Sequence, residues 1–378
     1  MYFTEAHEEL RRNIRRFVET ELAPHAAEWE EAHYFPDWVF RRMGELGFLG
    51  LRYPAEYGGQ GGDYFTAIVL AEELARCGSG GIGMAIEVHT EMATPPVFKF
   101  GTEDQKQRFL VPAIKGEKIA ALGITEPGAG SDVANTKTTA VKKNGYYVIN
   151  GRKIFITNGQ RCDWILLVAR TDPEAGHHGF SLFLVDKQTP GFHVTRVLDK
   201  LGMWSSDTAE LLFEDCKVPE ENLLGTPGEG FQMLMWELQG ERLIGAASMV
   251  AGAQVTFEYA LEYAKNREAF GRPIAKWQVI KHKLVDMATK IEAARQLVYA
   301  TAYKWDKGEY PVKEISMAKL VASKVACDVA DDAIQILGGY GYIREYPVER
   351  AWRDARLGRI GAGTDEIMKE IIAKAYGL

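Results

Sequence analysis

Residues 146–159 read Tyr146-Tyr147-Val148-Ile149-Asn150-Gly151-Arg152-Lys153-Ile154-Phe155-Ile156-Thr157-Asn158-Gly159 and contain two runs of β-forming residues, each followed by Asn-Gly. Asn-Gly pairs favour the two-residue turns of β-hairpins. We therefore expect strands over 146–149 and 154–157 with a turn at Asn150-Gly151. Further runs of the same kind lie at Trp164 to Ala169, Phe180 to Val185, Phe192 to Val197 and Leu211 to Phe213. Together they predict a compact antiparallel β domain, which we place at residues 117–227.

Helical spacing of apolar residues dominates before this β region. Leu10 and Ile14 begin one such pattern. Thr102, with Gln105 three residues later, has the form of a capping box that opens a further helix. We therefore expect an α-helical domain over residues 1–116.

The helical pattern returns after Pro227-Gly228. It fills three long stretches and a shorter one, at about 230–265, 275–307, 312–337 and Thr364 to Ala375. Four such helices must bury a face against one another, so residues 228–378 are predicted to form an antiparallel four-helix bundle. The fold class is therefore α+β and mostly α. Because the strands are enclosed between two helical blocks and do not alternate with helices, a Rossmann dinucleotide site is not expected.

Composition narrows the function further. The 378 residues carry 45 Lys and Arg against 52 Asp and Glu, and this net charge of −7 offers no basic surface for nucleic acid. The longest uncharged apolar stretch, about Leu243 to Phe257, is too short to span a membrane. Four widely spaced cysteines without C-x-x-C predict neither disulfides nor a metal site. No secretory signal is expected, which makes the cytoplasm the default location, although a processed mitochondrial matrix protein would look the same.

The segment from Leu122 to Asp132 is the one richest in chemistry, and it reads LGITEPGAGSD. Pro127 and several small residues keep its backbone irregular and open. Backbone N–H groups and the hydroxyls of Thr125 and Ser131 can therefore approach the carbonyl or phosphate groups of a ligand. A Gly-rich turn that simply leaves a strand would have the same composition.

Three stretches of the chain resemble signatures of the acyl-CoA dehydrogenase family. The first is TEPGAGSD at 125–132, which is similar to the family's flavin-binding signature. The second is R-x-x-F-G at 267–271, followed by Gln278. The third begins with QILGGYG at 335–341 and continues to Arg356. The resemblance covers essentially the whole chain and implies an N-terminal α domain, a middle β domain and a C-terminal four-helix bundle.

The resemblance implies an FAD-dependent oxidoreductase that converts a fatty or branched acyl-CoA into the trans-2-enoyl-CoA. Removing a proton beside a thioester requires a positioned carboxylate base and hydrogen bonds to the thioester carbonyl. A hydride then leaves the next carbon for FAD. The resemblance also implies electron-transfer flavoprotein as the electron acceptor and assembly as a homotetramer.

The base that the resemblance implies is Glu241. Many family members carry a Glu immediately before a late Gly-Thr, where this chain has Ala362. A minority branch, which includes the long-chain and isovaleryl enzymes, carries its Glu just before an Arg on the first long C-terminal helix, and Glu241-Arg242 looks like that arrangement. An adjacent Glu-Arg pair on a helix is otherwise an ordinary ion-paired surface feature. Ala362 still offers its backbone N–H to the thioester oxygen.

The remaining site residues also follow from the resemblance. Phe155 would line the flavin ring at a position where the family often has Trp. The residues expected to bind FAD are Leu122, Thr125, Gly130, Ser131, Phe155, Thr157, Arg267, Phe270, Gln278, Gln335, Gly338, Gly339, Thr364 and Glu366, and those from Arg267 to Gly339 would act partly from a neighbouring subunit. Those expected to face the acyl-CoA are Ser131, Gln239, Arg242 and Ala362.

Several alternatives stay open. The same fold could serve an acyl-CoA oxidase or a flavin monooxygenase, and Ala362 could mark a non-catalytic flavin- or acyl-CoA-binding homologue that has lost its base. Glu91 could act as a second acid near the acyl pocket, but we expect it at the surface. The small residues Gly361 and Ala362 leave room for a long or branched acyl chain.

Overall fold

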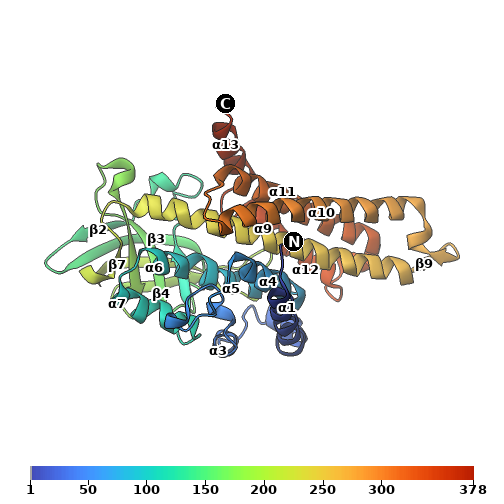
Figure 1. Cartoon of the computed structure of the whole chain (residues 1–378), viewed down its shortest axis with the longest axis horizontal. Helices are drawn as coiled ribbons and strands as arrows, with labels where there is room; N and C mark the ends of the chain where they lie inside the picture. The colour runs from blue at the N-terminus through green and yellow to red at the C-terminus, as the bar shows by residue number, and fades with distance from the viewer. Residues whose placement is uncertain (1) are drawn as a thin grey trace.

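The N-terminal part of the chain is helical, as predicted (Figure 1). The structure is a computed structural model that describes residues 2–378. Thr102 and Gln105 exchange both hydrogen bonds of the predicted capping box, which confirms the helix start at this point. The α-helices of this part are α1 (Glu5–Phe17), α2 (Ala26–Glu31), α3 (Trp38–Glu45), α4 (Tyr64–Leu74), α5 (Gly80–Glu87), α6 (Thr94–Phe100), α7 (Glu103–Gln105) and α8 (Val111–Ile114), joined by short π- and 3-10-helical segments.

The middle part is a β-sheet at one end of the molecule (Figure 1). Its strands are β1 (Ala120–Gly123), β2 (Thr139–Lys142), β3 (Tyr146–Thr157), β4 (Trp164–Arg170), β5 (Phe180–Asp186), β6 (Phe192–Val197), β7 (Thr208–Pro219) and β8 (Leu223–Leu224). The strands follow the order β6-β7-β3-β2-β4-β5-β8, and β1 pairs with β4. Pairing is antiparallel except that β1 and the first residue of β2 lie parallel to β4.

The hairpin predicted at Asn150-Gly151 is wrong, because β3 runs unbroken through this pair. The Asn150 side chain instead bonds to Asp215 on β7: its Nδ2 donates to Oδ1 at 3.1 Å and its Oδ1 accepts the Asp215 N–H at 2.8 Å. The register between β3 and β7 shifts at this point, so the strand bulges. A Cβ at Gly151 would come within 2.3 Å of Thr138 Oγ1. The glycine is therefore required because Thr138 packs closely against it, and not because the chain turns here.

The C-terminal part contains the predicted helices, of which α9 (Gly230–Asn266), α10 (Gln278–Asp306) and α11 (Val312–Leu337) lie side by side (Figure 1). The shorter α13 (Asp365–Ala375) packs against α11. An additional helix, α12 (Pro347–Ala355), lies outside the predicted stretches. A small hairpin of β9 (Glu268–Ala269) and β10 (Arg272–Pro273) follows the far end of α9.

Helix α9 belongs to two hydrophobic cores. Near its start, Leu234 and Leu238 pack in a core with Trp164 and other residues of the β-sheet. Further along, residues such as Leu243 and Ile244 pack in a core shared by α4, α10 and α11. The two cores meet on this helix in the stretch that carries Glu241.

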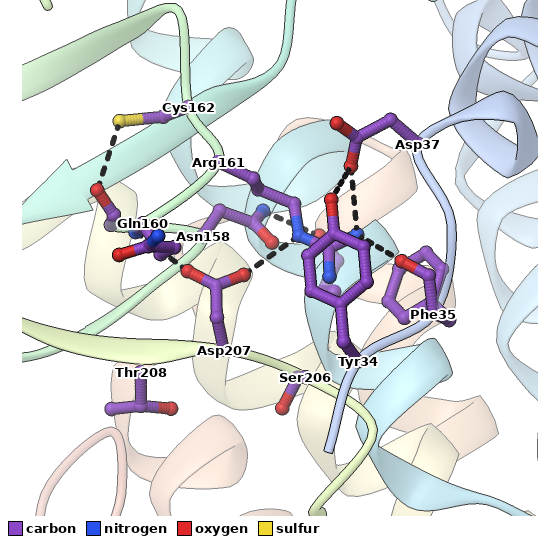
Figure 2. A network of polar contacts seen from close by, with 12 residues as sticks. Tyr34, Phe35, Asp37, Asn158, Gln160, Arg161, Cys162, Ser206, Asp207 and Thr208 are labelled. Atoms are coloured by element: carbon purple, nitrogen blue, oxygen red, sulfur yellow. Dashed lines mark hydrogen bonds and ion pairs between the residues drawn. The ribbon is translucent and has the colours of Figure 1, made fainter. Parts of the chain in front are cut away.

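Arg161, in the turn after β3, ties the β-sheet to the N-terminal helices (Figure 2). Its Nε donates to Asp207 Oδ1 at 2.7 Å, and its Nη1 donates to the Phe35 carbonyl oxygen at 2.9 Å. The guanidinium carbon lies 4.1 Å from the centre of the Tyr34 ring. Both charged side chains are almost fully buried, at 1% exposed for Arg161 and 2% for Asp207. Arg161 Nη1 also lies 3.2 Å from Asp37 Oδ1, but the buried Asp207 charge depends on Arg161 for compensation.

Within residues 2–378, no helix is long and apolar enough to cross a membrane. The four cysteines are free thiols, three of them buried and Cys327 partly exposed.

Replacing Arg161 by Met is expected to lower the free energy of unfolding by about 3 to 5 kcal/mol, because it leaves the Asp207 carboxylate buried without its cation. Urea denaturation followed by tryptophan fluorescence measures the change. The matched control is Arg152→Met, whose side chain is 61% exposed and should cost less than about 0.5 kcal/mol. Equal losses in both variants would contradict a specific role for the buried ion pair.

Candidate active site

The loop that follows β1 is fastened to β3 by a buried lysine. Lys153 Nζ donates to the Ile124 carbonyl oxygen and to Glu126 Oε1, both at 2.9 Å. Glu126 also accepts the backbone N–H groups of Lys137 at 2.7 Å and Thr138 at 3.0 Å. Burial pushes the pKa of Glu126 up, but the Lys153 charge and these hydrogen bonds outweigh burial and keep the pKa below its usual value. The ion pair between Glu126 and Lys153 thus fixes the base of the loop.

The outer part of this loop is open. Gly130 and Ser131 are exposed, and a Cβ added at Gly130 would meet nothing within 4 Å. Phe155 lies beside the loop, because the neighbouring Ile154 N–H donates to the Thr125 carbonyl oxygen at 2.9 Å. Phe155 has a φ of 62°, which is strained for a bulky residue, and it is 65% exposed. An exposed aromatic ring beside an open loop fits the flavin ring that the resemblance implies.

Leu122 and Thr157 lie at the ends of the two strands that carry this loop and Phe155. Leu122, in β1, packs partly buried against the core that contains Leu238 of α9. Thr157 is the last residue of β3 and is partly exposed. The predicted flavin-ring residues therefore lie where β1 and the loop after it run close to the end of β3.

Helix α9 carries two acids on one face, Glu237 and Glu241, one turn apart. Glu237 is buried and Glu241 is partly exposed. Burial raises the pKa of Glu241, while the charges of Arg242 and Lys319 oppose that rise. Gln239 lies between the two acids in sequence; its Nε2 donates to the Met235 carbonyl oxygen at 3.0 Å. Gln239 Oε1 is buried without a hydrogen-bond partner in the described part of the chain, which leaves an acceptor free for a ligand.

The segment from Gly361 to Thr364 is held against α9 and α11 by two buried cations. Arg242 Nε donates to the Ala362 carbonyl oxygen at 2.9 Å, and Lys319 Nζ donates to the Gly363 carbonyl oxygen. Ala362 has a φ of 56°, an uncommon conformation for a residue with a side chain. The structure therefore places Ala362 and Arg242, two of the predicted substrate residues, in direct contact.

Thr364 and Glu366 begin helix α13. The Thr364 hydroxyl accepts the Ile367 N–H at 3.3 Å and caps the helix, while the Glu366 side chain is exposed. The neighbouring Asp365 is buried and ion-paired to Arg359 at 2.6 Å. This end of the segment is thus anchored by a helix cap and an ion pair, with Glu366 free to contact a ligand.

Glu91 is not at the surface, so the expectation for it is wrong. It lies in the π-helical segment η6 (Val88–Ala93), is 9% exposed and is ion-paired to Arg52 at 2.6 Å. A Cβ at Gly240 would lie 3.9 Å from the Glu91 carbonyl oxygen, so this acid is packed near the start of the Glu241 turn. The sequence missed this burial because no local pattern shows which helix covers η6.

The other predicted FAD residues do not lie near the loop after β1 in the same chain. They cluster at the far end of α9, around the β9–β10 hairpin and the end of α11 (Figure 1). Phe270 is 92% exposed there. The members of this exposed group are Arg267, Phe270, Gln278, Gln335, Gly338 and Gly339.

Several residues that shape the site were not predicted: Glu126, Lys153, Glu237 and Lys319. Lys153 and Lys319 are charged residues at positions that the surrounding apolar pattern assigns to a buried face, and that signal could have found them. Glu126 lies inside the quoted signature, but its role depends on Lys153, 27 residues away.

Within the described residues 2–378, no group of three or more His, Cys, Asp or Glu side chains could hold a metal ion.

A helical part, a β-sheet and a helical bundle, with an open loop beside an exposed aromatic ring, fit a flavoprotein oxidoreductase class. Three family profiles match the chain: acyl-CoA dehydrogenase N-terminal domain over residues 4–117, middle domain over 121–216 and C-terminal domain over 228–377. The chain belongs to the acyl-CoA dehydrogenase family.

Similar proteins agree with this assignment. The chain is 44% identical over 374 residues to an acyl-CoA dehydrogenase of Bacillus subtilis, covering 99% of this chain and 98% of that protein. It is 43% identical over 371 residues to a short-chain specific acyl-CoA dehydrogenase of Clostridium acetobutylicum, covering 98% and 97%.

Solved structures agree as well. An acyl-CoA dehydrogenase from Geobacillus kaustophilus superposes with a TM-score of 0.97 at 43% identity, covering 100% of this chain and 99% of that one. An FAD complex of PigA has a TM-score of 0.96 at 30% identity, covering 100% and 98%. The protein is an FAD-dependent oxidoreductase of this family.

Replacing Lys153 by Met is expected to weaken FAD retention at least about tenfold, because the buried Glu126 carboxylate loses its cation and the loop its anchor. The ratio of flavin to protein absorbance after gel filtration at limiting FAD measures retention. Lys143→Met, an exposed lysine between β2 and β3, is the matched control. Full flavin content in the Lys153 variant would show that the loop keeps its shape without this pair.

Proposed function

We propose that this protein oxidises a fatty or branched acyl-CoA to the trans-2-enoyl-CoA, with Glu241 as the base that removes the α-proton. The observation that carries the proposal is the tie between Arg242 and the Ala362 carbonyl oxygen. It sets Glu241, the residue next to Arg242, beside the segment that lacks a carboxylate at position 362.

The electrostatics of Glu241 suit a base. Burial raises the pKa of Glu241 above its usual value, which strengthens it as a proton acceptor, while the charges of Arg242 and Lys319 oppose the rise. The α-proton passes to a Glu241 carboxylate oxygen. The Ala362 N–H and the free Gln239 Oε1 are available for polar groups of the substrate. When bound, FAD supplies the hydride-accepting chemistry.

The residues that would hold FAD fall into two groups, and we infer that two copies of the chain supply them. The loop after β1 supplies the first group with Phe155, and the residues around Arg267 supply the second. From Glu241 to Asn266 at the end of α9 the helix rises about 38 Å, more than the diameter of a small domain. A site that uses both groups needs the far end of a neighbouring chain, which agrees with the expected homotetramer.

We infer an acyl-CoA substrate from membership of the family. The similarity to a short-chain specific enzyme makes short-chain acyl-CoAs the first substrates to test. Electron-transfer flavoprotein as acceptor, a role in fatty acid β-oxidation and a cytoplasmic location belong to the same proposal. An oxidase on the same fold differs only in passing the electrons to oxygen.

The test is an anaerobic titration of the holoenzyme with acyl-CoAs of graded length and branching, following the loss of oxidised-flavin absorbance. Glu241→Gln is expected to slow this bleaching at least about a hundredfold while retaining FAD, because an amide cannot accept the proton. Glu262→Gln, an exposed acid on the same helix, is the control. Near-normal bleaching by the Glu241 variant would reject it as base. Oxygen consumption with substrate would favour the oxidase, and FAD that no thioester bleaches would favour the binding protein.

Co-expression of two inactive variants tests the shared site. In an assembly of Glu241→Gln with Arg267→Ala chains, one site combines both defects and the other has neither, so activity should return. Purification through two different tags isolates the mixed assembly, and flavin reduction per FAD measures its activity. If each site were built from one chain, both sites would stay defective and the mixture would remain inactive.

A further inference from the structure

Glu237 lies one helical turn before Glu241 on α9, and the mechanism above gives it no task. Its side chain is buried, with the residue 2% exposed. No N–H or hydroxyl group within residues 2–378 donates a hydrogen bond to either carboxyl oxygen, and the side chain within reach to share a proton is that of Glu241. A buried ionised carboxylate without such partners is strongly unfavourable. Glu237 must therefore be neutral or share a proton with a neighbour.

The charges around Glu237 identify that neighbour. On its own helix it faces Glu241 and Arg242. The Arg242 guanidinium is directed to the Ala362 carbonyl oxygen, and no ion pair joins it to Glu237 among the described residues. Burial, and then the charge of Glu241, raise the pKa of Glu237 well above its usual range, and the charge of Arg242 offsets only part of this rise. Of the two acids Glu237 is the more buried and is the one that keeps its proton.

The groups on the elements packed against this face do not offer Glu237 a counter-charge. The charge of Lys319, on α11, lowers the pKa of Glu241, and its Nζ donates a hydrogen bond to the Gly363 carbonyl oxygen. The Tyr310 hydroxyl, from the connection between α10 and α11, donates to the Met235 carbonyl oxygen at 3.2 Å. Arg52, in a turn of the N-terminal part, is paired with Glu91. The partner left for Glu237 is therefore Glu241.

We propose that Glu237 is a positioning residue that carries a proton at neutral pH and donates it in a hydrogen bond to the ionised carboxylate of Glu241. This proposal rests on Glu241 being the base. The bond orients the Glu241 carboxylate and stabilises its charged form. When Glu241 takes up the substrate proton, both acids are neutral, and that proton later leaves from Glu241 to solvent.

The proposal is tested by two variants, Glu237→Gln and Glu237→Leu, and by the pH dependence of the rate constant for flavin reduction. In the wild type the rate falls as pH drops through the pKa of Glu241, because the base must be ionised. Gln keeps an uncharged donor and should leave this acidic limb in place. Leu removes the donor, destabilises the carboxylate and should move the limb to higher pH by about one unit.

An ionised Glu237 would shift the acidic limb in the other direction. If Glu237 were ionised in the wild type, both variants would remove a negative charge beside Glu241 and move the limb to lower pH. A rate loss equal at every pH, with the limb unmoved in the Leu variant, would indicate a purely structural role. Either outcome overturns the proposal.

A second measurement needs no substrate. Infrared difference spectra of wild type minus Glu237→Gln holoenzyme at pH 7 should show the carbonyl band of one protonated carboxyl group. Glu87→Gln serves as a reference, because burial raises the pKa of Glu87 to about 8 and gives it a protonated band of its own. A carboxylate band in place of the acid band would reject the proposal even if Glu241 is the base. Retained turnover in Glu241→Gln rejects the base itself, whatever the spectra show.

Discussion

The burial of α9 in two cores is the constraint on which the site depends. Leu234 and Leu238 are fixed by the core under the β-sheet, while Leu243 and Ile244 are fixed by the core of the bundle and α4. A helix packed at both ends in close-packed interiors cannot shift or rotate without disturbing both. The turn that carries Glu241 lies where the two cores meet. The backbone of this turn is therefore held in one position relative to both the β-sheet and the bundle.

Charged side chains in the scaffold form complete ion pairs, whereas the two acids of α9 at the candidate site do not. Lys153 with Glu126, and Arg161 with Asp207, are complete pairs whose charges are compensated. Glu237 and Glu241 have no ion-paired partner of this kind. The nearby cations Arg242 and Lys319 donate their hydrogen bonds to backbone carbonyl oxygens instead. A complete ion pair on Glu241 would depress its pKa and make it a weak base. Because compensation is incomplete, burial keeps the pKa of Glu241 above its usual value.

Local signals were enough to predict much of the fold. Apolar spacing fixes the helix–β–helix order, and Thr102 with Gln105 marks a helix start, because both depend on residues within a few positions. Asn150-Gly151 was mispredicted as a turn. Its conformation depends on Asp215 and Thr138, which lie on other parts of the chain and contact the pair only in the folded sheet. The burial of Glu91 likewise depends on Arg52, 39 residues away. Such long-range pairings are not encoded in any short pattern.

The same limit applies to the candidate site. Sequence signatures identify residue types such as Glu241 and Arg267, but they do not say which copy of the chain supplies each one. The length of α9 separates the two by more than the diameter of a small domain, and this separation supports the proposal that two copies of the chain share one FAD. If one FAD binds across two chains, it binds the assembled state more tightly than the separate chains. By mass action, cofactor and assembly then stabilise each other, so loss of flavin and loss of quaternary structure should be coupled events.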